Sequence, residues 1–156
     1  MRKTVLGLLI TGLLAAAPSF AEDHSSMHEK MMKAGGPKAD DRVELKLPDA
    51  MKVMQKRMMR QHLDTVGEIT LALSSGDMAK ASAAARGLGW SAEEEKRCSA
   101  VSEMTGEKDF LAFGMAVHKS ADDLAASAEA GDRDKALMNL SRLIKSCNAC
   151  HEKFRH

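Results

Sequence analysis

The feature that most constrains the fold is a series of apolar positions near the C-terminus that continues through a cysteine and a histidine. The series consists of Leu137, Leu140, Ile144, Cys147, His151 and Phe154. Steps of three and four residues place these side chains on one face of an α-helix, because a helix makes one turn in about 3.6 residues. We therefore predict a last helix that is capped by Asp132, runs to the C-terminus and turns this face toward the core.

Four further segments have a helical pattern, and they cover residues 48–73, 77–86, 91–103 and 109–130. Pro48 suits the first turn of a helix, and Asp77 and Ser91 are residues that cap helix N-termini. Aromatic residues make up 3% of the chain, which disfavours a β fold, because strands are rich in aromatic and β-branched residues. The sequence predicts an all-α protein, an antiparallel four-helix bundle whose C-terminal helix carries the cysteine pair.

The N-terminal residues have the composition of an export signal. Residues 1–21 combine a basic start, an apolar run and a Ser-Phe-Ala ending, so we predict a signal peptide that is cleaved after Ala21. No second apolar run of spanning length follows, so we expect no membrane span and an exported, soluble protein of a bacterial periplasm. We interpret residues 22–46 as a flexible leader and residues 47–156 as one folded domain.

The leader is rich in imidazole and thioether side chains. They belong to His24, Met27, His28, Met31 and Met32. Such groups suit Cu(I), which prefers soft ligands. A solvated tail without a ligand is the simpler interpretation, and the sequence leaves both open.

The segment from Cys147 to His151 has the form C-x-x-C-H, which is typical of covalent haem attachment. Two thiols one helical turn apart can form thioethers with the two vinyl groups of haem c, and the adjacent imidazole can bind the iron. A zinc site needs a second pair of ligands, and the sequence does not suggest one. A redox-active C-x-x-C is typical of a βαβ context, which the sequence does not suggest either. We expect one covalent haem c with its iron on Cys147, Cys150 and His151. We expect Cys98 to be a free thiol rather than half of an intermolecular disulfide.

The sequence around this motif resembles the class II cytochromes c, the group that contains cytochrome c prime and its methionine-ligated relatives. The resemblance spans about residues 47–155 and rests on CNACHEKFR at 147–155, AEAGDRDKA at 128–136, LPxxM…MRxHL at 47–63 and GMAVHKSA at 114–121. It implies that Cys147 and Cys150 form the thioethers and that His151 is the fifth iron ligand. It also implies that Arg155 lies beside that histidine and tunes it; a solvated charge at the helix C-terminus is the alternative.

The same resemblance implies that the residue above the other haem face comes from the first helix. Low-spin members of the group have a methionine there, and five-coordinate members have an aliphatic residue. We expect Met59 to be the sixth ligand, because it is in phase with Leu63, Val66, Ile69 and Leu73, which we expect to face the core. The alternatives are Met51, Met54, Met58, His62 or no ligand. We expect His118 to pack in the core or to bond a haem propionate.

Charge and residue types narrow the class of function. A net charge of +1 argues against a nucleic-acid partner, and the sequence offers no acid–base pair that indicates an enzyme. We expect a periplasmic carrier that transfers one electron through a His/Met-ligated haem and docks transiently with partner redox proteins. The resemblance makes a homodimer a further possibility. The alternative function is that of a five-coordinate haem protein that binds nitric oxide or another gas.

Overall fold

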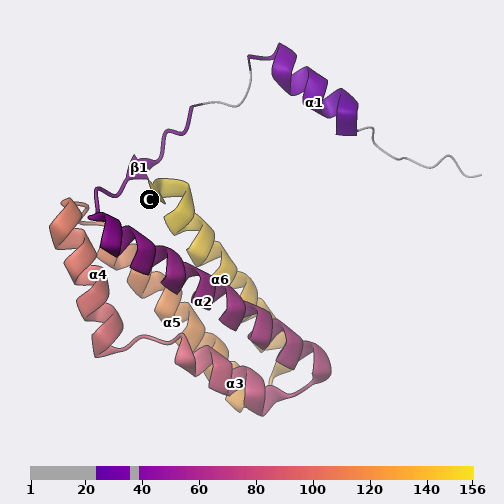
Figure 1. Cartoon of the computed structure of the whole chain (residues 1–156). Helices are drawn as coiled ribbons and strands as arrows, with labels where there is room; N and C mark the ends of the chain where they lie inside the picture. Colours follow the sequence, from indigo (N-terminus) through magenta and orange to yellow (C-terminus); the bar gives the residue numbers. More distant parts are fainter. Residues whose placement is uncertain (1–23, 36–38) are drawn as a thin grey trace, which may run out of the picture. The chain divides into compact units, whose positions relative to one another are not determined.

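The computed structural model describes residues 24–35 and 39–156 of the chain (Figure 1). These residues belong to two units, one that ends at Asp40 and one that comprises Asp41–His156. The predicted signal peptide lies outside the described residues. Within the two described stretches, no helix is both long enough and apolar enough to cross a membrane.

The larger unit contains five helices, which confirms the all-α prediction. They are α2 (Asp49–Ser75), α3 (Met78–Gly87), α4 (Ala92–Thr105), α5 (Phe110–Glu129) and α6 (Arg133–Lys153). Side-chain caps start three of them at the predicted residues: Asp77, Ser91 and Asp132 each accept a hydrogen bond from the backbone N–H three residues later. Gly76 ends α2 with φ 77°, a left-handed conformation that favours glycine.

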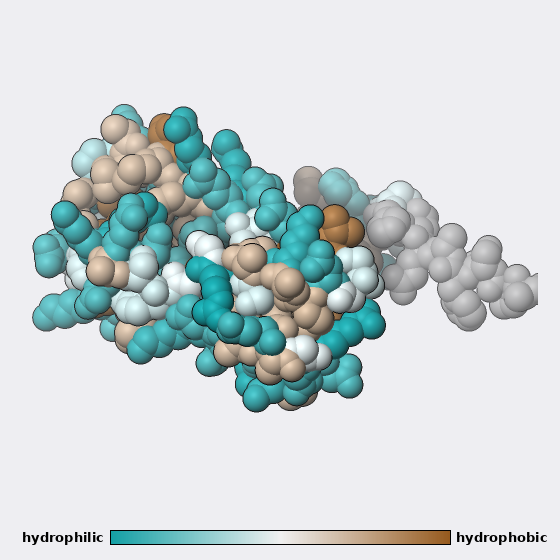
Figure 2. Space-filling view, turned by 90° about the horizontal axis from the view of Figure 1, so that it is seen from below, coloured by the Kyte–Doolittle hydropathy of each residue, from teal (hydrophilic) through white to brown (hydrophobic). Residues whose placement is uncertain are grey.

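The long helices α5 and α6 lie side by side, α2 passes in front of α5 in the view of Figure 1, and α3 and α4 cover the remaining side in turn. α5 packs against both α6 and α3, α3 also packs against α2, and α4 packs against α5. The fourth side of the bundle is therefore formed by two shorter helices that meet at the turn before Ser91. On the face seen in Figure 2, hydrophilic side chains surround smaller areas of weakly hydrophobic residues.

Two apolar cores stabilise the larger unit. The first is built around the fully buried Ile69, Leu73, Leu124 and Leu143, together with buried alanines of α2, α3, α5 and α6. Alanine side chains let helix backbones approach closely, which explains the dense packing of this part of the bundle. The second core lies where the chain enters and leaves the unit, and its buried members are Leu45, Leu47, Cys98, Val101, Phe110 and Phe154.

A short strap joins the entry and exit segments of this unit, and it corrects two predictions. The strand β1 (Val43–Glu44) pairs in parallel with β2 (Phe154–Arg155). α6 therefore ends at Lys153 rather than at the C-terminus, because Phe154 turns extended and packs edge-to-face on Phe110, 5.6 Å between ring centroids. The leader is also shorter than predicted. Residues 41–46 belong to the folded unit, and Leu45 is 1% exposed.

The smaller unit contains a helix where we expected an irregular leader. α1 (His24–Lys33) is ten residues long, and its side chains are exposed from Ser25 to Lys33. Glu29 and Lys33 form an ion pair of 2.6 Å along it. Strong helix formers such as Met, Lys and Glu explain why this segment is helical although it lacks a buried face.

Candidate functional site

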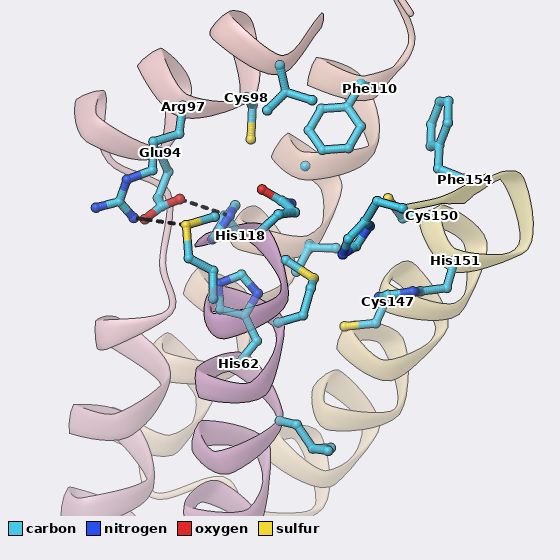
Figure 3. Close-up of a pocket in the computed structure, with 18 of the residues that line it drawn as sticks. His62, Glu94, Arg97, Cys98, Phe110, His118, Cys147, Cys150, His151 and Phe154 are labelled. Carbon is cyan, nitrogen blue, oxygen red and sulfur yellow. Dashed lines mark hydrogen bonds and ion pairs between the residues drawn. The ribbon is translucent and has the colours of Figure 1, made fainter. Parts of the chain in front are cut away.

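A cavity of about 460 Å³ opens between α2, α4, α5 and α6 (Figure 3). This volume falls within the range of about 300–1,000 Å³ that is usual for cofactor pockets. Side chains from four helices and from the strap line it, and most of them are apolar. The cavity lies next to the second core, because Cys98, Val101 and Phe110 belong to both.

The α6 wall of the cavity carries the C-x-x-C-H segment. Cys147, Cys150 and His151 all line the cavity, as the helical spacing predicts. Both thiols are half-buried, and all three cysteines of the chain are free. Burial raises the pKa of Cys147, and burial together with the charges of Cys147 and Cys98 raises the pKa of Cys150 to about 11. A redox-active C-x-x-C needs a lowered thiol pKa, so this environment does not suit that chemistry.

The facing wall belongs to α2 and separates the four methionine candidates into two groups. Met58 and Met59 line the cavity, together with Gln55, His62 and Leu63. Met51 instead packs against the second core, and Met54 is 44% exposed without adjoining the cavity. Of the described methionines, only Met58 and Met59 therefore share the cavity with His151.

Buried polar residues form one edge of the cavity, and they were not predicted as a group. His118 is 4% exposed; its Nδ1–H donates to the Leu88 carbonyl at 2.7 Å, and its Nε2 lies 3.5 Å from Glu94 Oε2. Figure 3 shows His62 and His118 across the cavity from Cys147 and His151. The structure thus favours the packing role for His118, because both ring nitrogens already have protein partners.

His62 packs edge-on against the His118 ring, with 5.4 Å between the centroids. Burial lowers the pKa of His62 to about 4, and electrostatic interactions with His118, Arg97 and His151 act in the same direction. The imidazole of His62 is therefore neutral at pH 7.

Arg97 occupies the same edge and distinguishes Met58 from Met59. Its Nη1 donates to Glu94 Oε1 at 2.7 Å and lies 4.0 Å from the Met58 sulfur, while its Nη2 pairs with Glu93. The Met58 sulfur thus accepts a hydrogen bond from the Arg97 guanidinium at the polar edge of the cavity. The sequence signal in this segment is Ser91, which predicts the start of a helix and does not reveal that Glu94 and Arg97 border a cavity.

A tetrapyrrole suits this cavity by the chemistry of its walls. Leu63 is 70% exposed and Ile144 is 41% exposed, although both belong to series that we expected in the core. Both line the cavity, so an apolar macrocycle held there would cover them. Thiols and an imidazole on one wall and thioethers on the other match the donor set of haem c.

Comparison with protein families agrees with this geometry. The model of the family described as Cytochrome C' matches residues 46–155. The chain belongs to the cytochrome C' family. Comparison with curated proteins and with solved structures gave no match. Membership implies a covalently bound haem c with its iron, and it confirms both the resemblance to class II cytochromes c and the four-helix bundle.

In this cytochrome C' family member, Arg155 belongs to the strap. Arg155 Nη2 donates to Glu44 Oε2 at 3.3 Å, and Arg155 is not among the residues that line the cavity. In this position the residue joins the two strands of the strap, and its predicted role beside His151 stays a prediction. Sequence reasoning missed Arg42, whose Nη1 donates to the His151 backbone carbonyl at 3.2 Å. The two residues are 109 positions apart in sequence, so only the tertiary structure reveals this contact.

Proposed function

We propose that this cytochrome C' family member carries single electrons through a haem c with His/Met ligation. Cys147 and Cys150 are the proposed thioether residues, and His151 and Met59 are the proposed axial ligands. The observation that supports this most directly is that the thioether of α2 and the imidazole of α6 line one cavity from opposite walls. Bound haem supplies reversible one-electron chemistry, and the protein sets its environment.

The choice of Met59 rests on what surrounds its competitors. The Met58 sulfur is within 4.0 Å of the Arg97 guanidinium, and His62 packs against the His118 ring. Met51 and Met54 do not line the cavity. Met59 lines it and is half-buried, and no described interaction occupies its sulfur.

The chain's own residues would tune the electron carrier in three ways. A thioether ligand raises the potential of the iron relative to a second imidazole. The apolar walls of α5 and α6 limit water near the iron. The backbone of His151 is held by Arg42, which restrains the end of the helix that carries the proximal imidazole.

We infer that the protein is an electron carrier rather than an enzyme. After export to the periplasm, this carrier docks transiently with partner redox proteins. Self-association into a homodimer belongs to the same proposal, and sedimentation of the haem-loaded protein at several concentrations tests it. Cell fractionation tests the location.

The visible spectrum of the ferric protein tests the ligation. We expect a low-spin spectrum with the weak far-red band of methionine ligation, lost in Met59→Ala and kept in the matched variant Met58→Ala. A high-spin spectrum of the unsubstituted protein, with binding of nitric oxide to the ferrous form, would instead establish the five-coordinate gas-binding function. A pyridine haemochrome assay of Cys147→Ser, with the unsubstituted protein as control, tests the covalent bond.

A further inference from the structure

The helix α1 collects its soft donor groups on one side. At about 100° per residue, the positions of Met27, Met31, His28 and Met32 fall within an arc of about 140°. The helix position of His24 falls inside the same arc. The remainder of the helix surface carries serine, glutamate and lysine. The helix is therefore two-sided, although neither side is buried.

The exposed side consists of thioethers and imidazole rather than of ordinary apolar groups. Met27 is 49% exposed, Met31 is 54% exposed and His28 is exposed. A helix that docks in an apolar groove usually presents larger aliphatic or aromatic anchors, and this ten-residue helix has none. Its acidic residue, Glu29, is paired with Lys33 away from the soft arc.

We propose that α1 binds Cu(I) through the sulfurs of Met27 and Met31 and the imidazole of His28. Met31 is four residues from Met27 and three from His28, and residues at these spacings have Cβ atoms about 5–6 Å apart, so the three long side chains can converge on one ion around Met31. Thioether and imidazole ligands select Cu(I) over Ca²⁺ or Mg²⁺, which need oxygen ligands. The donors of this site come from the smaller unit, and none of them lines the cavity that holds Cys147, Cys150 and His151.

This site is independent of the proposed electron transfer. α1 belongs to the smaller unit, and the haem cavity belongs to Asp41–His156. A ten-residue helix is marginally stable by itself in water, and an ion that bridges positions one turn apart favours the helical state. Cu(I) binding and helix formation should therefore occur together.

Competition with the chromophoric chelator bicinchoninate tests the proposal on the haem-loaded protein, with ascorbate and without oxygen. We expect the protein to withdraw an equimolar amount of Cu(I). The double variant Met27→Leu/Met31→Leu should lose this binding. The matched control Met104→Leu/Met138→Leu should keep it, since those two methionines are also exposed but lie on other helices. His28→Gln should weaken the binding.

A second measurement excludes binding elsewhere. With methyl-labelled methionine in the ferrous protein, Cu(I) should shift the Met27 and Met31 methyl resonances and leave those of Met104 and Met138 in place. Failure of the unsubstituted protein to withdraw Cu(I), or undiminished withdrawal by the Met27/Met31 variant, overturns the proposal. The second result would point to the free thiol of Cys98. Because the ferric spectrum reports only the haem, failure of either proposal leaves the other standing.

Discussion

Replacing Leu45 by alanine tests whether the strap is part of the folded domain. Leu45 is 1% exposed and packs in the second core with Phe110 and Phe154, and its backbone N–H donates to the Arg155 carbonyl at 2.8 Å. Leu45→Ala keeps that hydrogen bond and removes the buried side chain. Loss of transfer energy and the cavity left behind should cost about 2–5 kcal/mol of the free energy of unfolding.

Urea unfolding of the haem-loaded protein, followed by far-UV circular dichroism, measures this loss. With a slope of about 1–3 kcal/mol per M urea, the midpoint should fall by about 1 M or more. Leu71→Ala is the matched control, because Leu71 is 64% exposed on α2 and its loss should change the free energy by less than about 0.5 kcal/mol. Equal effects of the two substitutions would refute the placement of residues 41–47 in the folded unit.

Two further predictions concern the wall of the haem cavity. Burial and the nearby charge of Glu94 raise the pKa of Cys98 from 9.0 to about 11. Iodoacetamide at pH 8 should therefore alkylate this thiol about 100-fold more slowly in the folded than in the urea-unfolded protein, as measured by mass spectrometry. Equal alkylation rates in the two states would contradict the burial of Cys98. A Cβ added at Gly114 would lie 2.5 Å from the Cys98 sulfur, so Gly114→Ala should lower the free energy of unfolding by about 1–3 kcal/mol. The same substitution in a Cys98→Ala background should cost clearly less, and a loss that is the same in both backgrounds would exclude this clash as its cause.

Local signals predicted most of the helices. The caps Asp77, Ser91 and Asp132 act over three residues of backbone, so the sequence is sufficient to recognise them. Gly76 ends α2 for a similarly local reason. Burial was less predictable: Leu63 and Ile144 follow the helical period and yet are exposed, because they border the cavity. Periodicity identifies the inward side of a helix and does not reveal whether protein or another group covers it.

The strap was missed because it depends on contacts across the whole unit. Glu44 and Arg155 are 111 residues apart in sequence, and each strand is two residues long. Two residues are too few to show the alternation by which strands are recognised. The helix α1 was missed because its periodic residues are methionine and histidine rather than aliphatic residues.

The sequence by itself determined that Cys147, Cys150 and His151 share one helical face, since their spacing and the helix period are both local properties. Only the tertiary structure decided that Met58 and Met59, and not Met51 or Met54, adjoin the same cavity. It also decided that Arg97 lies beside the Met58 sulfur and that Arg155 belongs to the strap. These positions depend on how helices rotate and pack against one another, and that is settled by side chains distant in sequence.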